Sequence, residues 1–215
     1  MISETHKYIR EGRSLIEKAL DYEDFLLRRS LGLYYMAWGS AFVLFVIAGF
    51  IYSAYSSFSW SLPVIYVGVS LIAMFFTGYV FSRAAKASTL LKSVYRRSYH
   101  ILDFSLFAII LAMVSISIIY DIYNYFVVFY IILSVYVPWV IFHIIKRSLS
   151  KVHFESWIAI LSFAAACMAS VAGIEKGLYL VLTLAWIIEA GVWFICGIIS
   201  IFSAYYQSVV IEDDG

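Results

Sequence analysis

Glu189 is the residue whose type and position most suggest chemistry in this sequence. It lies in the stretch LTLAWIIEAGVWFICG, residues 182–197, whose other residues carry no charge. A charged side chain near the middle of a membrane helix costs roughly 2.5–3.5 kcal/mol on insertion scales, so a carboxyl group there needs a role that compensates for the cost. Because burial disfavours the charged form of a carboxyl group, we expect Glu189 to be protonated at neutral pH.

Two roles are open for Glu189. In one, it exchanges protons or binds a cation in a transport pathway, which is a common use of intramembrane carboxylates. In the other, it is a neutral group that hydrogen-bonds to a neighbouring helix. Its expected neighbours are two tryptophans on its own helix and two serines, among small residues at four-residue spacing, in the preceding apolar run: Trp186, Trp193, Ser162 and Ser170.

A second group of polar residues is expected at one boundary of the membrane. His100 and Asp103 open the third apolar run, His143 lies at the end of the fourth, and His153 and Glu155 precede the fifth. Imidazole and carboxylate together suit Zn²⁺ or Fe²⁺. The spacing matches no metalloprotease pattern such as H-E-x-x-H, so we predict a polar interface cluster and no metal site.

Other catalytic signals are missing from the sequence. It has no G-x-S-x-G motif, no glycine-rich phosphate loop and no pair of membrane aspartates. Cys167 and Cys196 both lie in apolar runs, which predicts neither a disulfide framework nor a zinc site. We therefore predict no enzyme activity and no cofactor.

The composition places these residues in a membrane. Hydrophobic residues make up 64% of the chain and charged residues 13%, whereas soluble domains carry roughly 25% charged residues. A helix crosses a bilayer in about 20 apolar residues. Six runs meet or approach that length: residues 31–53, 62–81, 101–120, 125–145, 157–173 and 178–202. The sequence predicts an all-α membrane helix bundle of six spans, arranged as three hairpins, over residues 31–205.

The distribution of basic residues predicts the orientation. All but one of the 15 Lys and Arg residues lie in the N-terminal region or in the connections after the second and fourth spans, the exception being Lys176. Basic connections usually stay in the cytoplasm. We therefore expect a multi-pass protein of the cell membrane with a cytoplasmic N-terminus and a short acidic cytoplasmic tail, residues 206–215.

Residues 1–30 are predicted to form a cytoplasmic amphipathic helix region. Apolar side chains recur there at helical spacing, with charges on the other faces: Tyr8, Leu15, Ala19, Tyr22 and Leu26. Ser14 and Glu17 fit a capping box, which predicts a helix start near Ser14. The helix can pack on its own protein or on a partner, and its balanced charge favours protein over lipid contact.

The connection between the second and third spans is basic and holds no acid. Its bases are Arg83, Lys86, Lys92, Arg96 and Arg97. Such clusters beside a membrane helix attract anionic lipid headgroups. No nucleic-acid-binding module accompanies them, so we expect membrane lipids as partners and no nucleic acid.

Two function hypotheses follow. The first is an accessory or assembly subunit of a membrane complex, whose N-terminal helix and basic inner connections engage a partner while Glu189 makes a hydrogen bond between helices. Its partner is another protein or further copies of the same chain. The alternative is a small channel or a proton- or cation-coupled transporter that uses Glu189 and works as an oligomer. Transporters usually place several polar groups at the midplane and often break helices there. This sequence has one proline within a span core, Pro138, so the first hypothesis is preferred.

Overall fold

The computed structural model describes residues 2–54, 61–88, 92, 97, 101, 104–120, 124–147 and 151–213. Over this part of the chain the ordered elements are helices, which confirms the all-α prediction there. They are α1 (Ile2–Ala54), α2 (Ser61–Ala87), α4 (Ser105–Tyr120), α5 (Asn124–Arg147), α6 (Phe154–Glu175) and α7 (Tyr179–Asp213).

Five of these helices are long and apolar enough to cross a membrane, namely α1, α2, α5, α6 and α7. They are compatible with a membrane-embedded protein. Helix α4 has 16 residues, which is shorter than the roughly 20 residues that a span needs. The sixth span and the three-hairpin arrangement stay predictions, because the turns at residues 55–60 and 121–123 lie outside the described residues.

The turn between α6 and α7 follows directly from its sequence. Gly177 has a φ of +67°, in the left-handed region that glycine adopts without steric cost. The Leu178 N–H donates to the Gly173 carbonyl at 2.7 Å, and the Gly177 N–H donates to the Ile174 carbonyl at 3.1 Å. These two bonds form the Schellman ending of a helix, after which the chain reverses into α7.

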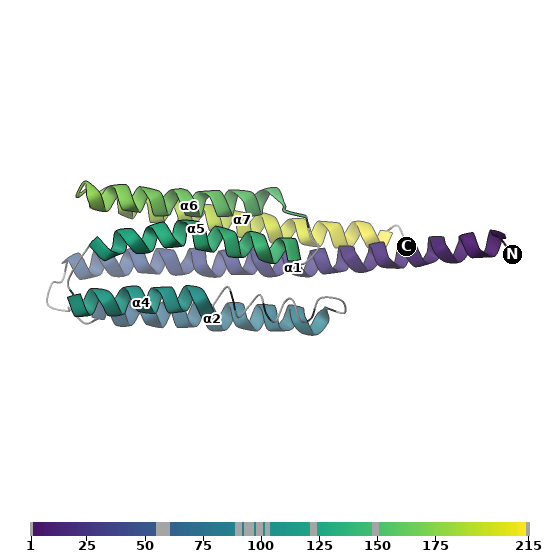
Figure 1. Cartoon of the computed structure of the whole chain (residues 1–215), viewed down its shortest axis with the longest axis horizontal. Helices are drawn as coiled ribbons and strands as arrows, with labels where there is room; N and C mark the ends of the chain where they lie inside the picture. The colour runs from purple at the N-terminus through teal and green to yellow at the C-terminus, as the bar shows by residue number, and fades with distance from the viewer. Residues whose placement is uncertain are drawn as a thin grey trace.

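The helices lie side by side along one axis, with α1 between the pair α2 and α4 and the group α5, α6 and α7 (Figure 1). Each helix packs mainly against two neighbours, in the cyclic order α1, α2, α4, α5, α6, α7. Helix α1 packs most extensively against α7, while α4 touches its neighbours least. The bundle is therefore tightest on the α1, α6 and α7 side.

Helix α1 is a single helix of 53 residues, about 80 Å long at a rise of 1.5 Å per residue. The predicted helix start near Ser14 is wrong, since α1 passes through that residue without a break. Glu17 instead pairs with Arg13, one turn earlier, at 3.1 Å. The N-terminal part of α1 extends past the ends of the other helices (Figure 1).

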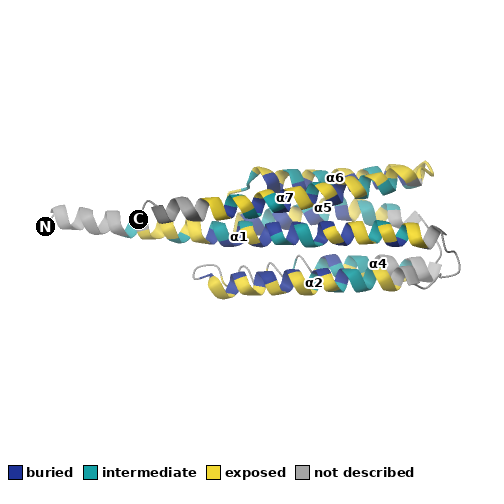
Figure 2. Ribbon diagram, turned by 180° about the vertical axis from the view of Figure 1, so that it is seen from behind, coloured by how far each residue is buried: buried dark blue, intermediate teal, exposed yellow. Residues whose placement is uncertain are grey.

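The packing of α1 also crosses the domain boundary expected at residue 30. Glu23, Leu26 and Leu27 precede that boundary and are buried. Further along α1, buried and exposed residues alternate around the helix (Figure 2). Many of the exposed residues of the bundle are large and apolar. The buried residues of the segment before residue 30 therefore pack in the bundle.

Aromatic side chains fill the space between α1, α6 and α7. The Trp193 ring lies 5.3 Å from that of Phe42 and 5.4 Å from that of Phe163, measured between ring centroids. Its indole N–H donates to the Ala159 carbonyl of α6 at 3.0 Å. Tyr34 completes the group, with its ring centroid 6.1 Å from that of Trp193.

Two glycines let α1 and α7 approach almost backbone to backbone. A Cβ atom on Gly197 would lie 2.5 Å from Cγ of Met36 and 2.6 Å from the carbonyl oxygen of Gly32. Real Cβ atoms do not come so close to a carbonyl, so this approach requires glycine. Small residues serve the same purpose in membrane helix pairs generally.

Candidate functional site

Glu189 lies inside the bundle, with 1% of its surface exposed. Its Oε1 atom is 3.2 Å from Oγ of Ser162 on α6, which also lies 3.2 Å from the Ala159 carbonyl oxygen. A serine hydroxyl has only one proton to donate. If Glu189 is protonated, it can donate to Ser162 while Ser162 donates to Ala159.

The other expected neighbours of Glu189 have different partners. Trp193 donates to Ala159, as described above, and Ser170 donates to the Ala166 carbonyl of its own helix at 2.8 Å. Trp186 packs its ring 5.0 Å from that of Phe42. Of the four expected neighbours, Ser162 is the one that the structure places in hydrogen-bond contact with Glu189.

The surroundings of Glu189 are apolar rather than ligand-rich. Phe42, Phe163, Trp186 and Trp193 contact one another in this part of the bundle. No group of three or more His, Cys, Asp or Glu residues that could hold a metal occurs among the described residues. Hard cations such as Ca²⁺ require six or more oxygen ligands. One carboxyl group and one hydroxyl fall well short of that number.

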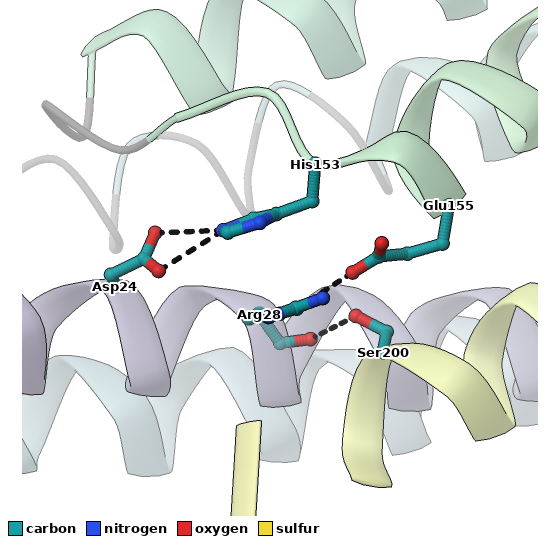
Figure 3. Close-up of polar contacts among 5 residues, drawn as sticks. All are labelled: Asp24, Arg28, His153, Glu155 and Ser200. Carbon is teal, nitrogen blue, oxygen red and sulfur yellow. Dashed lines mark hydrogen bonds and ion pairs between the residues drawn. The ribbon is translucent and has the colours of Figure 1, made fainter. Parts of the chain in front are cut away.

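A second polar site joins α1 to the start of α6, at the end of the bundle where α2 and α5 stop (Figure 3). We call this end of the bundle, where Asp24, Arg28, His153 and Glu155 lie, the basic end. Arg28 Nε donates to Glu155 Oε1 at 2.6 Å, and His153 Nε2 lies 3.0 Å from Asp24 Oδ2. The carbonyl oxygen of Arg28 accepts a hydrogen bond from Ser200 Oγ of α7 at 2.8 Å. Three helices are thus joined within about one turn of α1.

The Arg28 and Glu155 pair is largely removed from solvent, with 12% and 4% of the side chains exposed. Charge-assisted hydrogen bonds of this kind are short and strong. Glu155 also lies in the first turn of α6, where the helix dipole favours a negative charge. The pair formed by His153 and Asp24 is more exposed.

A further acid ties α2 to the same region. Glu23 is buried on α1, and its Oε1 accepts a hydrogen bond from Ser88 Oγ at 2.9 Å. Ser88 follows directly after the last residue of α2. The contacts at the basic end therefore link α1 with α2, α6 and α7.

The described residues of the predicted interface cluster, His143, His153 and Glu155, have separate partners. His153 and Glu155 each pair with a residue of α1 and not with each other. His143 stacks on Trp139 of its own helix, with ring centroids 5.3 Å apart. His100 and Asp103 lie outside the described residues.

The α1 partners of this site were not singled out from the sequence. Asp24 and Arg28 are four residues apart on one helix, a spacing that places them on one face. That spacing was the available signal, yet it occurs in most charged helices. Their partners lie 129 and 127 residues away, so only the fold identifies them.

The predicted headgroup-binding bases are solvent-facing where they are described. Arg83, Lys86, Lys92 and Arg97 are exposed. Arg96 lies outside the described residues. The Arg83 guanidinium lies 5.2 Å from the centroid of the Tyr79 ring.

Comparison of the chain with protein-family models, with curated proteins and with solved structures found no match to any of them. Its function is therefore argued from its own residues.

Proposed function

We propose that this chain is a membrane-embedded accessory or assembly subunit that binds a protein partner through the N-terminal part of α1. The observation that supports this proposal is the exposure of Leu15 and Ile16, at 69% and 62%, in the N-terminal part of α1. Leu20 and Tyr22 are exposed beside them. Exposed apolar side chains that gather in one place often mark an interaction site. We call these four residues the α1 docking face.

The docking face continues a packed surface. Ile16 and Leu20 precede Leu27 and Leu31 by eleven residues each, which is close to three helical turns, so they share one side of α1. Leu27 and Leu31 are buried in the bundle. A helix of a partner that packs on Ile16 and Leu20 would extend that existing surface, in the manner of an amphipathic helix in an apolar groove.

The charges around the docking face favour a protein over a membrane surface as the partner. Arg13, Glu17, Lys18 and Asp21 carry two positive and two negative charges, and all four are exposed. Helices that lie on anionic membranes are usually basic on their polar face. A mixed polar rim around apolar side chains is typical of protein interfaces.

The contacts at the basic end fix the position of α1 in the bundle, next to the docking face. Glu23, Asp24 and Arg28 follow Ile16 on α1. Glu23 is bonded to Ser88 directly after α2, Asp24 to His153 directly before α6, and the Arg28 carbonyl to Ser200 of α7. An interface held in its bound shape before binding loses less entropy on association. In this proposal Glu189 is a neutral group that joins α6 to α7. The transport alternative has less support, because aromatic side chains fill the space around Glu189.

The test is affinity purification of the tagged full-length protein from its native membranes in mild detergent, followed by mass spectrometry. The test variant is Leu15→Gln with Ile16→Gln, and the matched control is Arg13→Gln with Glu17→Gln on the same turns of α1. A deletion of residues 1–29 would remove Glu23, Asp24 and Arg28 and so disturb the bundle itself.

We expect a stoichiometric partner with the wild type and the control, and its loss with the test variant. A wild-type protein that is recovered alone would contradict the proposal. Liposome flux of the wild type beside Glu189→Gln would then test the transport alternative, in which Gln abolishes flux while the fold stays intact.

A further inference from the structure

The outward face of α2 changes from apolar to basic along a single line. Ile72, Phe75, Tyr79, Arg83 and Lys86 are all exposed. They follow one another at steps of three, four, four and three residues, which places them on one side of a helix. The line from Ile72 to Lys86 is about 21 Å long at 1.5 Å per residue.

The two bases at the end of this line, Arg83 and Lys86, form no ion pair with an acid in the described part of the chain. In contrast, Arg28 on α1 is bonded to Glu155 at 2.6 Å. Arg83 is held over the Tyr79 ring, a cation–π contact that fixes the guanidinium without neutralising it. Its positive charge is therefore accessible to an anionic ligand.

We propose that this face of α2 binds an anionic phospholipid, with the phosphate against Arg83 and Lys86 and an acyl chain along Ile72 and Phe75. The order of apolar, aromatic and basic residues matches the order of acyl chain, interface and headgroup in a membrane leaflet. The α1 docking face is surrounded by charges of both signs and lacks this order. The lipid site therefore stands on observations separate from the proposed protein partner.

The test is native mass spectrometry of the full-length protein in mild detergent with equal amounts of phosphatidylglycerol and phosphatidylcholine of the same acyl chains. The wild type retains phosphatidylglycerol in preference to phosphatidylcholine. Arg83→Gln with Lys86→Gln lowers retention of phosphatidylglycerol about tenfold or more, because each base near a membrane surface contributes separately to attraction. Retention of phosphatidylcholine stays the same.

Two further variants separate this site from general charge attraction. Arg13→Gln with Lys18→Gln removes the same charge from α1 and leaves phosphatidylglycerol retention unchanged. Tyr79→Ala frees the Arg83 side chain and gives an intermediate loss. Circular dichroism and thermal unfolding in the same detergent show that each variant is folded, which is expected because all these side chains are exposed.

Two outcomes overturn the proposal. One is equal phosphatidylglycerol retention by the wild type and by Arg83→Gln with Lys86→Gln. The other is displacement of the lipid by water-soluble glycerol phosphate at comparable concentration, which would show a site for free phosphate with no contribution from the acyl chain.

Discussion

Two buried glutamates in two regions of this molecule are accommodated in different ways. Glu189 lies in the middle of α7 and has the hydroxyl of Ser162 as its partner. Glu155 lies at the start of α6, at the basic end, and has the guanidinium of Arg28. Both are almost fully buried. The difference is that a base is within reach at the basic end, whereas the run around Glu189 contains none.

The two contacts, Glu189 with Ser162 and Glu155 with Arg28, should contribute differently to the stability of the fold. A neutral group that loses a hydrogen bond leaves behind a polar group with a modest desolvation cost. A buried ion that loses its partner leaves behind an uncompensated charge, which costs much more. We therefore expect the basic end to be more sensitive to substitution than the site of Glu189, although the sequence draws attention to Glu189 first.

Loss of the charge pair at the basic end should have the largest effect. Arg28→Ala leaves Glu155 buried and unpaired, which we expect to lower the free energy of unfolding by about 3–5 kcal/mol. Denaturant unfolding in detergent micelles measures this change. Arg28→Met together with Glu155→Leu should recover most of the loss. A loss below about 1 kcal/mol for the single substitution would show that the pair does not hold α1 to α6.

Crowding of the α1 and α7 contact should have the next largest effect. Gly197→Ala forces a methyl group against the Gly32 carbonyl, and overpacking of this kind costs typically about 1–3 kcal/mol. The control is Gly191→Ala on the same helix, where a Cβ atom meets nothing within 4 Å. Thermal unfolding that lowers the midpoint for both variants equally would contradict the role assigned to Gly197.

Substitution of Glu189 should have a smaller effect. Glu189→Gln keeps an uncharged donor and acceptor near Ser162, so we expect the free energy of unfolding to change by less than about 1 kcal/mol. Ser162→Ala should cost about 0.6 kcal/mol, the usual size of such a bond between membrane helices. If Glu189→Gln instead destabilises the protein as much as Arg28→Ala does, Glu189 is not the neutral group proposed here.

Loss of the second pair at the basic end should have the smallest effect. His153 and Asp24 are partly exposed, and exposed or partly exposed ion pairs contribute at most about 1 kcal/mol. We expect His153→Gln to lower the free energy of unfolding by no more than that amount in the same denaturant assay. A loss comparable to that of Arg28→Ala would show that the two pairs contribute equally to stability and would contradict this prediction.

The helical class, the membrane setting and the proximity of Ser162 to Glu189 could be predicted from the sequence. It did not predict that α1 is one helix from Ile2 to Ala54. A capping box indicates where a helix can start, but a helix that begins earlier in the chain can continue through these residues when tertiary packing stabilises it. Glu23, Leu26, Leu27 and Ser30 are buried in the bundle, and this packing supports a helix that continues past residue 30.

Composition and periodicity by themselves determined that this chain is helical and suited to a membrane, because both depend on local hydrophobicity along the chain. The partners of Arg28, Asp24 and Glu155 were decided only by the tertiary structure. An ion pair depends on the distance between two side chains, and residues more than a hundred positions apart come within 3.0 Å only after the helices have packed. The close approach of α1 and α7 at Gly32 and Gly197 was decided in the same way.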